Sequence, residues 1–177
     1  MKLQDAAHLI EHPLLRQQEN ARWVDLGCGN GFFTFALAQL LPRGSSIEAI
    51  DRRPVVLQSL PNPQHIAISR QQFDFTQQPL PFHDLTGLLM ANSLHYVQDK
   101  PAFIAQMKEH LGKQGCWLIV EYDTDKPNPW VPYPLSFRSL EKLFAAAGYP
   151  PPEKLKEMPS AYNTGKLYAA LVRSRLP

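Results

Sequence analysis

The sequence predicts an α/β fold: a three-layer sandwich whose mostly parallel, seven-stranded sheet ends in an antiparallel C-terminal edge hairpin. Strand-like runs alternate with helix-like segments between residues 22 and 147, and connections of that length favour strand–helix–strand units. The run over 85–91 is almost continuously apolar, which is typical of a strand covered on both faces. The last two strand-like segments have no helical segment between them, which indicates the hairpin.

The length and composition favour a single domain over residues 1–177. A chain of 177 residues is long enough to bury a core, and its 44% hydrophobic content is not that of a disordered protein. No apolar run approaches the ~18 residues of a membrane span. The N-terminus carries Asp5 and lacks the apolar stretch of a secretory signal. We therefore expect a cytoplasmic protein with no membrane partner.

The first half of the chain supplies the predicted elements up to the third strand. Leu3, Ala7 and Ile10 recur at helical spacing and predict an N-terminal helical segment within residues 1–20. The elements predicted next are a strand over 22–26, a helix over 31–41, a strand over 46–50 that ends at Asp51, one or two helical turns over 54–60, and a strand over 65–69.

The second half continues the pattern and then departs from it. The elements predicted here are a strand over 85–91, a helix over 100–111, a strand over 116–122, a helix over 136–147, and strands over 154–157 and 167–173. Seventeen prolines are about twice the usual share, and several fall within 123–135, which predicts an extended proline-rich loop.

Three glycines at alternate positions follow the first predicted strand. The run VDLGCGNG covers residues 24–31 and leads straight into a predicted helix. Glycine lets a backbone turn sharply and approach a ligand, and the N-terminus of a helix offers free N–H groups to it. Asp51 lies 24 positions after Gly27, at the end of the next strand, where a carboxylate can accept hydrogen bonds from ribose hydroxyls. The sequence therefore predicts a nucleotide-binding loop.

The spacing of the glycines separates two kinds of nucleotide site. Dinucleotide sites use GxGxxG, whereas Phe32 occupies the position of the third glycine here, which argues against a nicotinamide-dependent oxidoreductase. VDLGCGNG resembles motif I of class I S-adenosylmethionine-dependent methyltransferases of the Rossmann-like fold, in particular the type 11 group. The resemblance is clear over residues 20–122. It implies S-adenosylmethionine as cofactor and S-adenosylhomocysteine as product.

The resemblance also implies a set of cofactor-binding residues. Asp51 matches the acid that binds the ribose, Asp74 matches the acid that receives the adenine amino group, and the run over 89–97 resembles motif IV. The set is Asp25, Gly27, Cys28, Gly29, Gly31, Asp51, Arg52, Asp74, Phe75 and Asn92. Thr86-Gly87 departs from the pattern, because the family often has an acid at this point.

Acceptor-side residues are predicted from their place after the fourth and fifth strands. His95 and Tyr122 are the catalytic candidates, because ligands of open α/β sheets bind beyond the carboxyl ends of the strands. Tyr122, Asp123, Trp130 and Tyr133 are candidates for the substrate pocket, and residues 160–164 precede the last strand at the same end. Cys28 is expected to give backbone contacts and not to act as a nucleophile.

The leading hypothesis is a methyltransferase acting on a small molecule. An RNA or protein methyltransferase and a cofactor-binding protein without catalysis remain as alternatives. A net charge of +2 with scattered Lys and Arg does not indicate a nucleic-acid partner, and two cysteines without a CxxC do not indicate zinc or another metal. The acceptor and the oligomeric state are left open.

Overall fold

A computed structural model describes residues 1–159 and 165–174. Its helices are α1 (Leu3–Ile10), α2 (Leu14–Gln17), α3 (Phe32–Ala38), α4 (Lys100–Lys108) and α5 (Phe137–Ala146), with one 3-10 turn, η1 (Leu94–Tyr96). Its strands are β1 (Arg22–Leu26), β2 (Ser46–Asp51), β3 (Ala67–Gln72), β4 (Leu85–Ala91), β5 (Leu111–Tyr122), β6 (Glu153–Pro159) and β7 (Lys166–Arg173).

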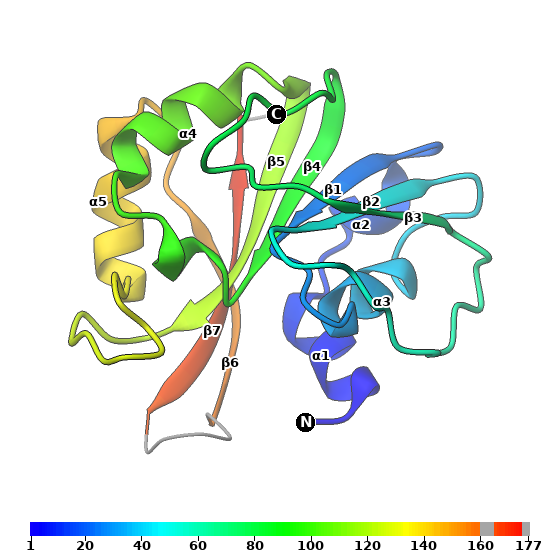
Figure 1. Ribbon diagram of the computed structural model, residues 1–177, viewed down its shortest axis with the longest axis horizontal. Coiled ribbons are helices and arrows are strands. Elements are labelled where there is room, and N and C mark those ends of the chain that lie inside the picture. The colour runs from blue at the N-terminus through cyan, green and yellow to red at the C-terminus, as the bar shows by residue number, and fades with distance from the viewer. Residues whose placement is uncertain (160–164, 175–177) are drawn as a thin grey trace.

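The strands of the described residues form one mixed sheet in the order β3-β2-β1-β4-β5-β7-β6. Neighbours from β3 to β5 are parallel, whereas β7 is antiparallel to both β5 and β6 (Figure 1). The predicted α/β fold, its seven strands and its antiparallel C-terminal edge are confirmed. The order reverses beside β1, so β1 and β4 flank the switch point at which open α/β sheets bind ligands.

Helices cover both faces of the sheet, and each face has its own buried cluster. Helices α1, α2 and α3 pack with alternate residues of the strands, such as Trp23 and Leu118, on one face. Helices α4 and α5 pack with the intervening residues, such as Val24 and Ile119, on the other face (Figure 1). Because successive strand residues point to opposite faces, the inner strands β1, β2, β4, β5 and β7 contribute to both clusters.

Helix starts follow the expected local chemistry. The Asp99 side chain accepts a hydrogen bond from the N–H of Ala102 at 3.0 Å and caps α4, whose first turn contains Pro101. The Ser136 hydroxyl accepts from the N–H of Ser139 at 3.2 Å and caps α5 in the same way. Helix α3 instead begins directly after the glycine loop and leaves the N–H groups of its first turn near that loop.

Two predicted elements between β2 and β4 were wrong, one completely and one in its bounds. Residues 54–60 are not helical, because the N–H of Gln58 donates to Asn30 O at 2.9 Å instead of closing a helical turn. The third strand covers 67–72 and not 65–69, because His65 has a φ of 52° that a strand cannot adopt. Strand and helix consequently do not alternate throughout, since no described residue between β2 and β4 is helical.

The helix predicted over 100–111 ends at Lys108, and β5 already begins at Leu111. The N-terminal segment forms two short helices. In the described part of the chain, no helix is both long and apolar enough to cross a bilayer. That residues 1–177 form a single domain stays a prediction.

Candidate functional site

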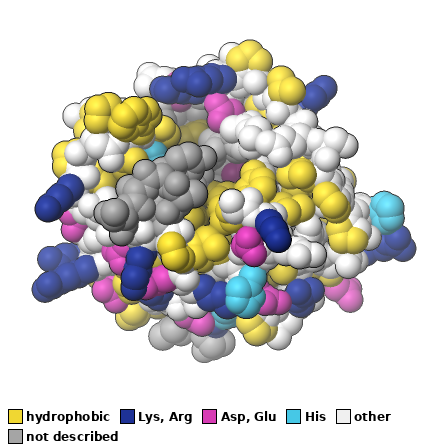
Figure 2. Space-filling model, turned by 90° about the horizontal axis from the view of Figure 1, so that it is seen from below, with side chains coloured by type: hydrophobic (Ala, Val, Ile, Leu, Met, Phe, Trp, Pro, Cys, Tyr) yellow, Lys and Arg dark blue, Asp and Glu magenta, His cyan; other side chains and the backbone are white. Residues whose placement is uncertain are grey.

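A cleft of about 910 Å³ opens at the carboxyl ends of the parallel strands. Figure 2 shows the molecule from this side, where hydrophobic side chains gather around a hollow. The lining residues come from the loops after β1 to β5, from the edge hairpin and from the N-terminus. They are Met1, Asp25, Gly27, Cys28, Gly29, Asn30, Phe32, Phe33, Asp51, Arg52, Arg53, Pro54, Val56, Asp74, Phe75, Thr76, Ala91, Asn92, Ser93, Tyr96, Tyr122, Met158, Pro159 and Leu167.

The glycine loop wraps around the end of β2. The N–H groups of Gly27 and Cys28 both donate to Ile50 O, at 2.9 and 3.0 Å. Gly27 has a φ of +82°, and a Cβ there would lie 2.7 Å from the Ser93 Cβ, so only glycine fits. Gly29 has a φ of +54° and open space beside its Cα, which leaves backbone accessible to a ligand. Gly31 does not line the cleft and serves to start α3.

Asp51 holds the glycine loop in place and still faces the cleft. Its Oδ2 accepts from the N–H of Gly29 at 3.0 Å, and its Oδ1 accepts from the N–H of Arg53 at 2.9 Å. Each carboxylate oxygen has a further lone pair, and the side chain is partly exposed. Asp51 can therefore accept hydrogen bonds from two ligand hydroxyls, as a ribose requires.

Asp25 is a buried acid with one unused oxygen. Only 1% of the residue is exposed, and its Oδ2 accepts from the Thr34 hydroxyl at 2.6 Å, while its Oδ1 has no hydrogen-bond partner. Burial raises the pKa of Asp25 to about 7, although the hydrogen bond from Thr34 acts in the opposite direction. The Oδ1 of Asn92 is also buried without a partner. Both residues line the cleft, where two such acceptors fit a ligand that brings a cationic amino group.

Asp74 and Phe75 form the wall after β3. Asp74 Oδ1 accepts from the N–H and the hydroxyl of Thr76, at 3.0 and 2.6 Å. Phe75 is buried, and its ring centroid lies 5.7 Å from that of Phe103. Arg52 lies over the ring of Tyr96, 5.9 Å from its centroid, so the cleft brings together loops from β2 and β4.

Cys28 lines the cleft but is unsuited to nucleophilic attack. Its Sγ donates to Gly29 O at 3.8 Å. Burial, together with the carboxylates of Asp25 and Asp51, raises the pKa of the Cys28 thiol far above its ordinary value. The thiol therefore stays protonated at neutral pH.

His95 forms a buried pair with Glu121 and does not line the cleft. Glu121 Oε2 lies 2.7 Å from His95 Nδ1, and Glu121 Oε1 accepts from the N–H of His95 at 3.1 Å. The two side chains are only 3% and 1% exposed. The His95 ring packs on Tyr96 with a centroid distance of 4.3 Å, and the ring of Tyr122 lies 6.2 Å away. The pair therefore lies behind two aromatic residues that do line the cleft.

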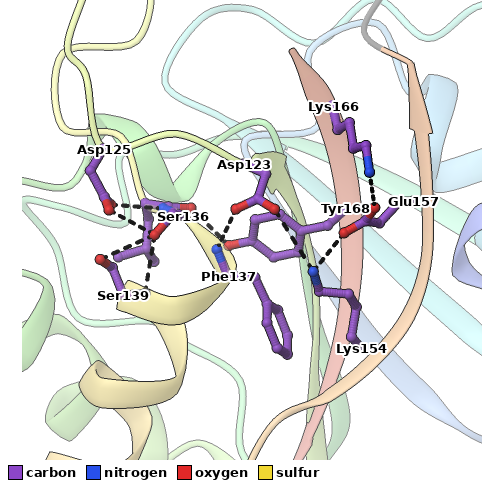
Figure 3. Close-up of polar contacts among 10 residues, drawn as sticks. Asp123, Asp125, Ser136, Phe137, Ser139, Lys154, Glu157, Lys166 and Tyr168 are labelled. Carbon is purple, nitrogen blue, oxygen red and sulfur yellow. Dashed lines mark hydrogen bonds and ion pairs between the residues drawn. The ribbon is translucent and has the colours of Figure 1, made fainter.

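Tyr122 lines the cleft, whereas the side chain of its neighbour Asp123 binds to the start of α5. The Asp123 carboxylate accepts from the N–H of Phe137 at 2.9 Å at the start of α5, and lies 3.8 Å from Lys154 Nζ (Figure 3). Asp125 similarly accepts from the N–H and hydroxyl of Ser136 (Figure 3). These bonds fix the start of the proline-rich loop to α5, and Asp123 does not face the cleft.

The proline-rich loop holds its two aromatic residues outside the cleft. Trp130 is 77% exposed and lies in a turn closed by two Asn128–Val131 backbone hydrogen bonds of 3.1 Å. Tyr133 is 38% exposed and is tied back by its N–H, which donates to His95 O at 3.0 Å. Neither lines the cleft. The residues 160–164 considered with them lie outside the described part of the chain.

The sequence matches the family model of a methyltransferase domain over residues 2–163. The chain belongs to this methyltransferase family. No curated protein matches it in sequence.

Solved structures resemble the methyltransferase over most of its length. The 1,6-didemethyltoxoflavin-N1-methyltransferase of Burkholderia thailandensis, with 1,6-didemethyltoxoflavin and S-adenosylhomocysteine bound, has a TM-score of 0.71 at 17% identity over 97% of this chain and 77% of that one. A methyltransferase of Methanosarcina mazei has a TM-score of 0.63 at 17% identity over 96% and 100%. The CurJ carbon methyltransferase has a TM-score of 0.67 at 16% identity over 90% of this chain and half of that one.

These likenesses show the fold. The methyltransferase has the Rossmann-like fold of class I S-adenosylmethionine-dependent methyltransferases, as the glycine loop predicted, and S-adenosylmethionine is the cofactor of that family.

The structure adds cleft residues of the methyltransferase that the sequence did not indicate. Met1, Tyr96, Met158, Pro159 and Leu167 line the cleft and lie far apart in the chain, and of these only Tyr96 belongs to a motif, the run over 89–97. Met158 and Leu167 lie on the two strands that were predicted as an edge hairpin. The alternation of side chains along those strands could have indicated which residues share a face. Which end of the hairpin reaches the cleft depends on its pairing with β5, which no local pattern gives.

Proposed function

We propose that the chain binds S-adenosylmethionine in this cleft and transfers its methyl group to a small-molecule acceptor. The observation that carries the proposal is the juxtaposition of the open Gly29 backbone, the Asp51 carboxylate and the unpartnered Asp25 oxygen in one cleft. An accessible backbone, an acceptor for hydroxyl groups and a buried carboxyl acceptor match the three polar parts of an adenosyl amino acid.

Each proposed cofactor contact follows from a donor or acceptor present in the chain. Asp51 accepts from the ribose hydroxyls, and Asp74 with Phe75 receives the adenine. Asp25 and Asn92 accept from the amino group of the methionine part. Arg52 closes the cleft against Tyr96. The N–H groups of Cys28 and the three glycines donate within the chain, so these residues contribute the shape of the loop and, at Gly29, the open space through which a ligand approaches the backbone.

The bound cofactor supplies an activated methyl group, and the chain supplies alignment for an in-line displacement. Tyr122 is the proposed acceptor-contacting residue, because its side chain lines the cleft. His95 acts through others: its pairing with Glu121 fixes the η1 turn and so the position of Tyr96. Asp123, Trp130 and Tyr133 have no proposed role in the acceptor pocket, because their contacts lie elsewhere.

The size of the cleft favours small acceptors over the RNA or protein alternative. Sites for small ligands measure about 300–1,000 Å³, and 910 Å³ lies near the upper end, which suits a cofactor and a small acceptor side by side. The Burkholderia thailandensis structure, of similar fold, holds such a pair. The basic residues that line the cleft are two adjacent arginines, which is a small footprint for a nucleic acid.

Isothermal titration with S-adenosylhomocysteine tests the proposal. We expect wild-type protein to bind and Asp51→Ala to bind about 10–100-fold more weakly, because a hydrogen bond to a charged group contributes roughly 1.5–3 kcal/mol. Glu141→Ala, on the exposed side of α5, is the matched control and should bind as wild type does. Absence of wild-type binding at millimolar ligand would contradict the proposal. Binding without turnover on a broad acceptor panel would favour the non-catalytic alternative.

A further inference from the structure

Charge is divided unequally between the two sides of the cleft. The charged lining side chains of the described residues are Asp25, Asp51, Arg52, Arg53 and Asp74, and all of them lie at the end of β1, β2 or β3 or directly after it. Within residues 1–159 and 165–174, the lining side chains from the N-terminus and from β4 to β7 carry no charge, and the charged group of Met1 is its α-amino group. We call the first group the polar side of the cleft and the second group the neutral side.

Three adjacent strands build the centre of the neutral side. Tyr122 on β5 pairs with Leu167 on β7, and Leu167 pairs in turn with Met158 on β6. Residues paired across strands have their Cβ atoms about 4.5–5.5 Å apart, so the three side chains form one continuous row. Met1 and Pro159 extend this surface.

The charged neighbours of this row are bound to one another and not to the cleft. Glu157 precedes Met158 and Lys166 precedes Leu167, so strand alternation directs both away from the row. Glu157 accepts from Lys154 Nζ at 2.6 Å and from Lys166 Nζ at 2.8 Å (Figure 3). These two hydrogen bonds hold the pKa of Glu157 at about 2, so the acid stays ionised and paired at neutral pH.

The buried carboxyl group behind the neutral side also has its hydrogen-bond partners within the chain. Glu121 uses both carboxylate oxygens on His95. A charged group placed against Tyr122, Met158 and Leu167 would therefore find no counter-charge among the described side chains of this row, and losing its hydration there is disfavoured. An apolar ligand would instead gain from contact with the same surface.

We infer that the methyl acceptor is an uncharged, largely apolar small molecule, held with its ring or chain against the row Tyr122–Leu167–Met158. This inference rests on the proposed function, because it assumes that the polar side holds the cofactor.

Two naphthalene probes that differ in charge test the inference. Protein is first titrated with S-adenosylhomocysteine and then, at saturation, with 2-naphthol or with 2-naphthoate, and binding is followed by probe fluorescence. We expect 2-naphthol to bind at least about tenfold more tightly than the anion, since an unpaired charge on an apolar wall is disfavoured. No variant is needed for this comparison.

A variant that adds a positive charge to the row gives a sharper test of the preference between the two probes. Met158→Lys places a cation on the half-buried row and should raise the affinity for 2-naphthoate about tenfold while weakening 2-naphthol. Ala145→Lys, exposed in the last turn of α5, adds the same charge away from the cleft and should change neither.

The outcomes separate the two proposals. Failure to bind S-adenosylhomocysteine defeats the proposed function. Normal binding of S-adenosylhomocysteine overturns only the acceptor inference if 2-naphthoate binds as tightly as 2-naphthol, if neither probe binds, or if Met158→Lys behaves as Ala145→Lys does.

Discussion

The polar and neutral sides of the cleft are built in different ways. The polar side comes from consecutive loops after β1, β2 and β3, whereas the neutral side joins the N-terminus to strands at the far edge of the sheet. The residues of the polar side are recognisable in the sequence, because its glycines and acids stand at fixed positions at the ends of consecutive strands. The residues of the neutral side come together only because distant strands pair with one another. Its lining can therefore change without any change in the loops of the polar side.

Each side has one buried carboxyl group nearby, and the two differ in how they are satisfied. Glu121 is fully buried and gives both oxygens to His95, so it is complete without a ligand. Asp25 gives one oxygen to Thr34 and leaves the other unpartnered beside the cleft. The comparison indicates that Glu121 serves the fold and that Asp25 is poised for a ligand, and it can be tested by removing each group.

The largest expected effect is the loss of stability in Glu121→Ala. The substitution leaves both the ring Nδ1 and the backbone N–H of His95 without their acceptor, and breaking a buried pair of this kind costs about 3–5 kcal/mol of unfolding free energy. Glu121→Gln keeps an acceptor of the same shape and should lose clearly less. Urea unfolding measures both, with exposed Glu109→Ala as the control. Equal unfolding free energies for wild type and Glu121→Ala would show that the pair does not support the fold.

A smaller effect is expected at Asp25, and it depends on pH. Burial raises the pKa of Asp25 from 3.8 to about 7, so between these values the unfolded chain loses a proton that the folded chain keeps. The folded state binds more protons there, and stability without ligand falls as pH rises through this window, by at most about 1.4 kcal/mol per pH unit. Asp25→Asn removes this loss and should gain stability relative to wild type from pH 4 to 7.

Urea unfolding of both proteins at pH 4.5, 5.5 and 7 gives the difference between their unfolding free energies at each pH. If this difference did not change with pH, the raised pKa of Asp25 would be contradicted. The same variant should bind S-adenosylhomocysteine more weakly, since it lacks the anionic oxygen. Weaker binding together with higher stability is the signature of a group kept for a ligand. Glu121→Gln should instead bind S-adenosylhomocysteine as wild type does.

The same contrast explains how far the sequence could predict the molecule. The strand at 22–26, its glycines and Asp51 were predictable because local backbone rules fix them, and the order of secondary structure followed from apolar patterns. The helical turns expected over 54–60 are absent because that segment bonds to Asn30 in the glycine loop, a contact no local rule contains. His95 was rightly expected beyond β4, yet its pairing with Glu121 needs the alignment of β4 and β5.

The smallest expected effect is that of Trp130→Ala. A tryptophan after the fifth strand was a natural candidate for an acceptor wall, but the hydrogen bonds of Asn128 hold it in an exposed turn away from the cleft. Truncating a side chain that is 77% exposed should change the unfolding free energy by no more than about 0.5 kcal/mol and leave 2-naphthol affinity unaltered. A tenfold loss of 2-naphthol binding would mean that the proline-rich loop closes over the neutral side when a ligand is present. In that case the neutral side would include a residue from outside the sheet edge, and the acceptor would be enclosed by aromatic surface on two sides.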